Sequence, residues 1–407
     1  MNRREFNKAA AAVGAAAAFS PLNVLAQQQK LKVGVILPLT GYLGQIGQSC
    51  KKGSDIAPGV IKEMLGVDIE LMTADFETNV DTARTRAERL IQEGANVLVG
   101  PFDSGAAAAI AQVAEQRGVP FVINIAAAPQ ITEQGYKFVF RNFQTAGDIV
   151  RNGLDLIGDL FRATNVAPRT AVFMHVNDTF GQAMSKGINA VLPRRTQLPF
   201  KLVDTISYDP AAKDLTVEVS KAKASKADFL LLVCRLNDAI LLKREMVKQR
   251  WNPMGIISPG SPGMYEEQYY KALGKLSEYA ISNVPWYNPA AKLTKVVEKA
   301  FLKANPKDRL EFHGLNAGFT FEALLIAADA FKRARSTDSK VLADAIRQTN
   351  ITEKMTLGGP IKFNAKGQVE GIGSACVQNR NLLPTVVLPA SAATAKPVFP
   401  FPDYKQA

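Results

Sequence analysis

Cysteine and histidine are scarce in this sequence of 407 residues, which contains three cysteines and two histidines. The cysteines, Cys50, Cys234 and Cys376, are far apart and form no CxxC pair, so neither a zinc site nor a thioredoxin-type centre is indicated. Cys234 and Cys376 could lie in neighbouring strands. We nevertheless expect free, buried cysteines.

Sequence motifs of catalysis are also missing: there is no GxSxG elbow, no HExxH helix and no Walker loop. His175 lies inside an apolar segment, as core histidines often do. We therefore expect no enzymatic activity, no metal and no cofactor. An exported enzyme stays open as an alternative, because Asp75, Asp103 and Asp178 end predicted strands, where carboxylates act as acids or bases or cap helices.

After the N-terminus, no apolar run reaches the roughly 18–20 residues that span a bilayer. Residues 1–26 have the pattern of an export signal: Arg3 and Arg4, then an alanine-rich apolar run over residues 9–19, then a small-residue cleavage site ending at Ala26. The paired arginines resemble a twin-arginine signal, with ordinary Sec export as the alternative. We expect the mature chain to lie outside the cytoplasm.

The formal net charge is +12. Lysine and arginine are spread among aspartate and glutamate, without a long basic arm, and we recognise no nucleic-acid-binding module. We expect no nucleic-acid partner, and we interpret the charge as a solvated surface that can favour anionic small molecules.

Short apolar segments alternate with helical patterns in two series, over residues 31–123 and 171–258. Residues 96–124 show the unit most clearly: an apolar strand, a loop, an alanine-rich helix ended by Gly118, and a second apolar strand. We predict an α/β fold with two Rossmann-like lobes, whose parallel sheets are flanked by helices.

Ser104 lies where the helix of that unit begins, beyond the carboxyl end of a predicted strand. Ligands of parallel sheets bind at this edge. Free backbone N–H groups and the positive end of the helix suit a carboxylate there. The alternative is that Ser104 is only an N-cap.

Six stretches carry a recognisable family pattern, in family order: LKVGVILPLTGYLGQIGQ from Leu31, LIQEGANVLVGPFDSGAAAAIAQVAEQRGVPFV from Leu90, FVFRNF from Phe138, NDTFGQAM from Asn177, ADFLLLV from Ala227 and MTLGGPIKFNAKGQV from Met355. Together they resemble the periplasmic solute-binding proteins of ABC importers, in the branched-chain amino-acid (Leu/Ile/Val-binding) family.

The resemblance implies a type I periplasmic-binding fold, in which two lobes joined by three crossovers close over a small molecule by hinge motion. It places residues 27–143 and 283–352 in the N-terminal lobe and residues 144–282 and 353–390 in the C-terminal lobe. The end of the chain is rich in proline, and we expect residues 391–407 to be a mobile tail. It implies a monomer in the periplasm that delivers its ligand to an ABC permease in the inner membrane. A ligand-sensing domain for a membrane receptor would use the same fold and is an alternative.

Two departures from the family pattern concern the ligand's α-ammonium group. In the amino-acid binders this group is held by a threonine and by an acidic residue. Ala127 stands at the first position, and the segment 259–261, which contains no acid, stands at the second. Burying an unpartnered ammonium costs several kcal/mol. The departures therefore favour an anionic ligand without an amine.

Two further departures favour an aromatic or hydrophobic carboxylate. Arg235 falls near a position where amino-acid binders carry tyrosine, and an arginine can hold a carboxylate bidentately. Phe180 replaces a tyrosine and could line an apolar slot. For Arg235 the alternative is a surface salt bridge with Asp238 or Glu245. For the ligand the alternative is a branched-chain amino acid, another amino acid or an amide.

The resemblance and these departures together give the predicted ligand-binding residues: Tyr42, Ile46, Phe102, Asp103, Ser104, Ile125, Ala126, Ala127, Phe180, Arg235, Ser261 and Asn316.

Overall fold

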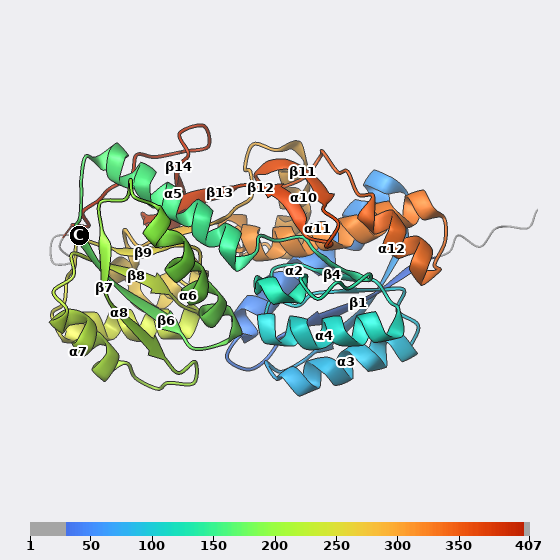
Figure 1. The fold of residues 1–407 in the computed structure, drawn as a ribbon. Coiled ribbons are helices and arrows are strands. Elements are labelled where there is room, and N and C mark those ends of the chain that lie inside the picture. Colours follow the sequence, from blue (N-terminus) through green and yellow to red (C-terminus); the bar gives the residue numbers. More distant parts are fainter. Residues whose placement is uncertain (1–29, 403–407) are drawn as a thin grey trace, which may run out of the picture. The chain divides into compact units, whose positions relative to one another are not determined.

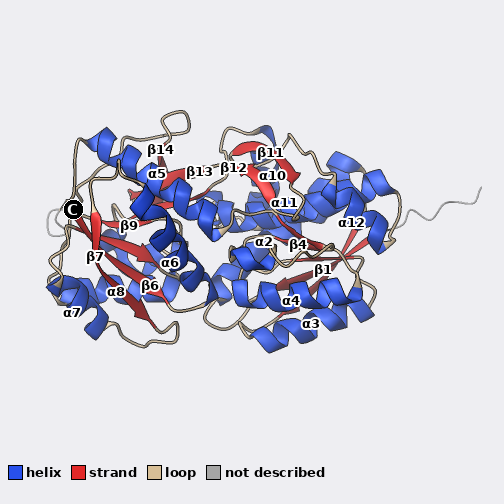
Figure 2. Ribbon diagram, viewed as in Figure 1, coloured by secondary structure: helices blue, strands red, loops and turns tan. Residues whose placement is uncertain are grey.

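The computed structural model describes residues 30–402, so the predicted export signal lies outside the described residues. The predicted α/β architecture is confirmed: two main sheets are each flanked by helices (Figure 2). Among the described residues, no helix is both long and apolar enough to cross a membrane.

The first lobe is built on a five-stranded sheet of order β2-β1-β3-β4-β5. Its strands pair in parallel, because a helix or a long connection separates each strand from the next. Its elements are β1 (Leu31–Leu37), α2 (Gly44–Leu65), β2 (Ile69–Asp75), α3 (Val80–Gln92), β3 (Val97–Val99), α4 (Ser104–Arg117), β4 (Phe121–Ile123), the 3-10 turn η1 (Pro129–Ile131) and β5 (Val139–Arg141).

Alternate residues of each strand face opposite helical layers. In β3, Val97 and Val99 share a core with α2 and the long helix α11 (Leu310–Ala334), whereas Leu98 packs with α3 and α4 (Figure 1). Two further helices of this lobe, α10 (Lys292–Ala304) and α12 (Ser339–Arg347), also come from late in the chain and pack near α2 and α11. The late segment therefore completes the first lobe.

The second lobe is built on a seven-stranded sheet of order β14-β13-β10-β9-β8-β6-β7. Strands β6 to β10 pair in parallel, and β13 and β14 add an antiparallel edge. The elements are α5 (Ala146–Thr164), β6 (Thr170–Val176), α6 (Thr179–Val191), η2 (Leu192–Arg194), β7 (Lys201–Tyr208), α7 (Thr216–Ala224), β8 (Phe229–Val233), α8 (Leu236–Lys248), β9 (Ile256–Ser258), α9 (Glu267–Leu273), η3 (Gly274–Ser277), β10 (Ile281–Pro285), β13 (Ser374–Arg380) and β14 (Leu383–Leu388).

A two-stranded hairpin, β11 (Gly358–Phe363) and β12 (Val369–Ile372), lies beside the first lobe rather than in the second lobe as predicted. The ring of Phe363 packs edge-on against Phe140 of β5 at 5.5 Å. The backbone N–H of Arg141 donates to the carbonyl of Gly367 at 2.8 Å. The chain therefore returns to the second lobe just before β13, about twenty residues later than the boundary predicted at residue 353.

Residues 391–402, which belong to the predicted mobile tail, pack against the second lobe. Phe399 is buried and its ring centroid lies 5.3 Å from that of Phe161. The N–H of Phe401 donates to the carbonyl of Met254 at 2.7 Å. Aromatic side chains anchor this proline-rich segment, because each ring buries a large apolar area.

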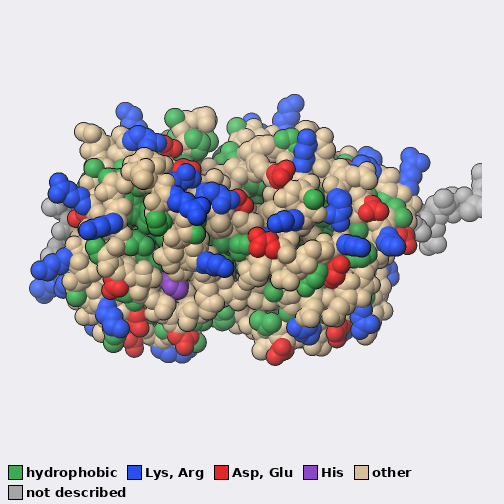
Figure 3. All heavy atoms as spheres, in the orientation of Figure 1, with side chains coloured by type: hydrophobic (Ala, Val, Ile, Leu, Met, Phe, Trp, Pro, Cys, Tyr) green, Lys and Arg blue, Asp and Glu red, His purple; other side chains and the backbone are tan. Residues whose placement is uncertain are grey.

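The three cysteines are buried and free, as predicted. Cys234 follows β8, and Cys376 lies in β13, two strands away across β9 and β10. On the face shown in Figure 3, basic and acidic side chains are interspersed, which fits the interpretation of the net charge as a solvated surface.

Candidate functional site

A cavity lies where the carboxyl ends of the two sheets meet. Both lobes and the long helix α11 contribute to its wall. The lining residues are Phe102, Ile125, Ala127, Phe143, Phe180, Arg235, Gly260, Pro262, Tyr265, Val284 and Leu315.

Five of the predicted ligand-binding residues are in this wall: Phe102, Ile125, Ala127, Phe180 and Arg235. Arg235 is the one charged residue among the described residues of the wall. The remainder is apolar or aromatic apart from the Tyr265 phenol. The cavity therefore suits a ligand with an apolar body and one polar end.

Three predicted residues adjoin the wall in the same loops: Asp103, Ser104 and Ala126. Asp103 caps α4, since its Oδ1 accepts from the N–H of Ala106 at 2.8 Å. The alternative that Ser104 is the cap is therefore wrong. Ser104 is the first residue of α4, and its hydroxyl does not cap the helix.

The Ser104 hydroxyl contacts the second loop of the site, residues 125–128. Its Oγ accepts from the N–H groups of Ala127 at 3.2 Å and Ala128 at 3.3 Å. Because the oxygen acts as the acceptor in both bonds, its own proton remains available for donation. The two amides are therefore already bound to Ser104, and the hydroxyl proton is the donor that this group can offer to a carboxylate beside the cavity.

The other predicted residues are not themselves in the cavity wall, although Ser261 and Asn316 are next to wall residues in the sequence. Ile46 is part of the hydrophobic core, and Tyr42 is 43% exposed with its carbonyl accepting from Asn237 of the second lobe. Ser261 is buried and accepts from the N–H of Cys234.

Arg235 is buried, with only 4% of its surface exposed, and it pairs with carboxylates that the sequence did not indicate. Its Nε and Nη2 donate to Oδ2 of Asp178 at 3.0 and 2.8 Å, and Nη2 lies 3.9 Å from Oδ2 of Asp103. The surface-pair alternative was wrong: Asp238 accepts from the backbone N–H of Arg235 instead, because it occupies the N3 position of α8.

The guanidinium of Arg235 also lies against two aromatic rings. Its central carbon is 4.5 Å from the ring centroid of Phe180 and 5.2 Å from that of Phe102. Burial lowers the pKa of Arg235, but Asp178 and Asp103 together raise it above its ordinary value, so the group stays charged. The bonds to Asp178 use Nε and Nη2, which leaves the protons of Nη1 for an acceptor in the cavity.

Position 260, at the predicted acid-free segment, has no room for a side chain. Gly260 has φ +148°, and a Cβ there would lie 1.8 Å from the Cγ2 of Ile149. An acid that was not predicted, Glu266, is buried and accepts from Nδ2 of Asn316 at 3.0 Å. Burial raises the pKa of Glu266 to about 7. Because Glu267 and Gln268 follow it directly, no local pattern marks Glu266 as a buried acid.

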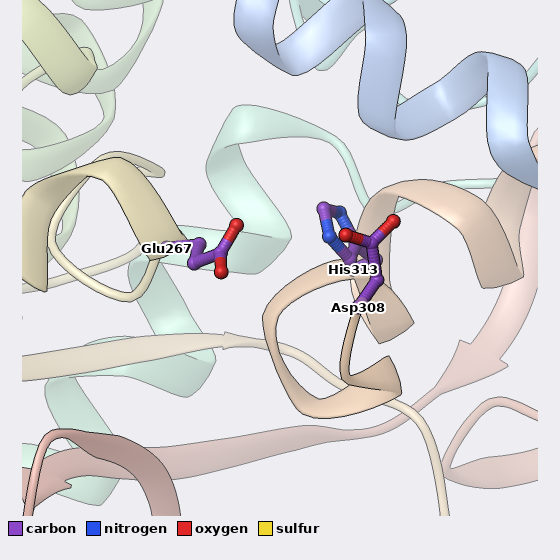
Figure 4. A group of neighbouring side chains, drawn as sticks. All are labelled: Glu267, Asp308 and His313. Carbon is purple, nitrogen blue, oxygen red and sulfur yellow. The ribbon is translucent and has the colours of Figure 1, made fainter. Parts of the chain in front are cut away.

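Among the described residues, one group has the composition of a metal site: Glu267, Asp308 and His313, whose ligand atoms lie within 4.8 Å of one another (Figure 4). Each carboxylate already pairs with a lysine. Lys52 Nζ lies 2.5 Å from Asp308, and Lys271 Nζ lies 2.9 Å from Glu267. This charge balance favours an ion-pair network over a cation site.

Two α/β lobes linked by three crossovers, with a cavity between their strand ends, define a two-lobe binding protein. The chain belongs to a family whose model, described as "Periplasmic binding protein", matches residues 30–376. Within it, the chain is a solute-binding protein of the ABC transporter type, in the Leu/Ile/Val-binding family. These are extracytoplasmic proteins without enzymatic activity, so the predicted class is confirmed.

Relatives named for branched-chain amino acids cover most of the chain. The Leu/Ile/Val-binding protein homolog 3 of Brucella melitensis is 23% identical over 83% of this chain and 88% of its own length. The leucine-, isoleucine-, valine-, threonine-, and alanine-binding protein of Pseudomonas aeruginosa is 24% identical over 84% and 87%. A solute-binding protein of R. palustris, solved in complex with benzoate, shares the fold with a TM-score of 0.75 at 18% identity, over 90% of this chain and all of that one (100%).

Proposed function

We propose that this protein captures a small compound with an apolar body and a carboxylate between its lobes, and delivers it to an ABC permease in the inner membrane. The observation that carries the proposal is the cavity itself. Its wall is apolar, and its polar side consists of the Arg235 guanidinium and, beside it, the Ser104 hydroxyl with loop 125–128. Export through a twin-arginine signal, and hence a periplasmic location, belong to the same proposal.

The names of the relatives favour a branched-chain amino acid as the ligand. An α-ammonium would need an acceptor near the cavity. Asp103 and Asp178 lie there, and both contact Arg235. Two carboxylates flank one guanidinium, so one of them could accept from the ammonium group of a ligand. An amino acid is therefore the candidate that the relatives support.

An aromatic acid without an amine is the second candidate, and the composition of the wall favours it. Phe102, Phe143, Phe180 and Tyr265 supply four aromatic side chains. Ala127 offers no hydroxyl, and the segment 259–261 offers no carboxylate, at the two places where the family resemblance puts the partners of the ammonium.

A thermal-shift screen of the mature protein tests the proposal. L-leucine, L-valine, benzoate and phenylacetate would be compared with the corresponding carboxamides. A ligand at about 100 times its dissociation constant adds roughly 2.7 kcal/mol to stability. We expect a shift with carboxylates and not with their amides. Shifts with leucine and valine alone would identify an amino-acid binder, and shifts with the aromatic acids alone an aromatic-acid binder. No shift with any carboxylate would contradict the proposal.

Replacing the serine at the start of α4, Ser104→Ala, should weaken carboxylate binding by roughly 1–3 kcal/mol. The substitution removes a donor and leaves the Ala127 and Ala128 amides without their acceptor. Isothermal titration calorimetry would measure the loss. Ser54→Ala is the matched control, because Ser54 is also buried in a helix but donates to the carbonyl of Lys51, away from the cavity. Equal affinities in the two variants would remove Ser104 from the site.

A further inference from the structure

Arg141 is a buried cation that the described ion pairs do not include. It lies in β5 with none (0%) of its surface exposed. Its four hydrogen-bonding partners are all neutral: Nε donates to Oε1 of Gln368 at 2.6 Å, Nη2 to Oγ1 of Thr132 at 2.6 Å, and Nη1 to the carbonyls of Ala128 at 2.7 Å and Ala126 at 3.2 Å.

The charge of this guanidinium is not neutralised by direct contact. Burial lowers the pKa of Arg141 to about 9, so the group remains protonated at neutral pH. Asp148 and Glu133 act on it only through longer-range attraction, since among the described residues no carboxylate lies within ion-pair distance of it. An unpaired buried charge is costly, and a protein that keeps one has a net positive potential at that place.

The carbonyls that bind Arg141 belong to loop 125–128 of the proposed ligand site. The peptide unit between Ala126 and Ala127 connects the two sides: its carbonyl accepts from Arg141, and its N–H donates to Ser104. A cation at the carbonyl end of this peptide fixes its orientation and polarises its N–H toward the cavity side. Preorganised dipoles of this kind favour negative charge in a water-excluded site.

We propose that Arg141 is a positioning residue for carboxylate capture: it orients loop 125–128 and supplies positive charge behind the amides that face Ser104. This inference rests on the proposed function, because it assigns the site an anionic group. Arg141 is not one of the residues of the cavity wall. Its effect is therefore expected on the preference for a carboxylate over the matching carboxamide, whereas a purely structural role would weaken the binding of both compounds alike.

Thr132 offers a matched pair of substitutions that changes the charge and keeps the shape. In Thr132→Asp the new carboxylate would accept from Nη2 of Arg141 and neutralise it. In Thr132→Asn an isosteric amide oxygen would accept the same bond and leave the charge in place. Calorimetry would measure each variant against benzoate with benzamide and against L-leucine with leucinamide.

We expect Thr132→Asp to weaken binding of the carboxylate about tenfold relative to Thr132→Asn, which corresponds to about 1.4 kcal/mol. The affinity for the carboxamide should be the same in both variants. Arg141→Met should lower the carboxylate preference similarly, and Arg141→Lys should restore part of it. Equal carboxylate preferences in Thr132→Asp and Thr132→Asn would overturn the inference. If the wild-type protein bound neither L-leucine nor benzoate nor any other carboxylate, the proposed function itself would fail instead.

Discussion

The substitution Arg235→Met should lower the free energy of unfolding by about 3–5 kcal/mol, the usual cost of removing one partner from a buried ion pair. It leaves Asp178 and Asp103 facing each other with side chains that are only 11% and 12% exposed. The methionine side chain would take the place of the apolar part of the arginine side chain beside the Phe180 ring. It would not replace the positive charge. Urea denaturation at pH 7 would measure the effect.

Two comparisons isolate the buried charge. In the double variant Arg235→Met with Asp178→Asn, part of the loss should be recovered, because one of the two unpaired carboxylates is removed. Arg89→Met should change stability by less than about 0.5 kcal/mol, since Arg89 pairs with Glu93 at an exposed i,i+4 position. A loss from Arg235→Met as small as that from Arg89→Met would contradict the buried ion pair.

Stability should also fall as the pH rises from about 4.5 to about 7, owing to Glu266. Burial raises the folded-state pKa of Glu266 from 4.5 to about 7, so the folded state binds the proton more tightly than the unfolded state does. The stabilisation that protonated Glu266 provides is complete below its unfolded-state pKa of 4.5. It is lost as the pH rises through its folded-state pKa of about 7. The shift corresponds to about 3 kcal/mol at pH 8.

Glu266→Gln should therefore flatten the pH dependence between pH 4.5 and 7 and raise the free energy of unfolding at pH 8 by roughly 2–3 kcal/mol. Chemical denaturation at several pH values would show this. Glu267→Gln is the matched control: Glu267 is the next residue along the chain and pairs with Lys271, so the variant should keep the slope of the wild-type protein. An unchanged slope in Glu266→Gln would show that Glu266 is ionised in the folded state throughout this range.

The strands and the loop–helix units were predictable, because local patterns determine them. The apolar run 97–99 and the alanine-rich helix ended by Gly118 appear as β3 and α4. The helices α5, α9, α10 and α12 were not predicted, although α5 begins with a capping box formed by Thr145 and Asp148. Attention to capping signals, in addition to apolar runs, would have found it.

The candidate site was predicted where it depends on loops at strand ends and was missed where it depends on distant partners. Phe102, Phe180 and Arg235 do meet at the cavity. That Arg235 pairs with Asp178, 57 residues earlier, depends on how β6 and β8 are placed side by side, which no local pattern specifies. The burial of Glu266 likewise depends on the packing of the second lobe beside α11.

The most direct test of carboxylate capture is a calorimetric titration of the mature wild-type protein with L-leucine and benzoate, each beside its carboxamide. Carboxylate recognition by Ser104, loop 125–128 and Arg235 predicts one site per chain and binding of at least one acid about tenfold or more tighter than its amide. Equal affinities for acid and amide, or binding of the amides alone, would contradict it.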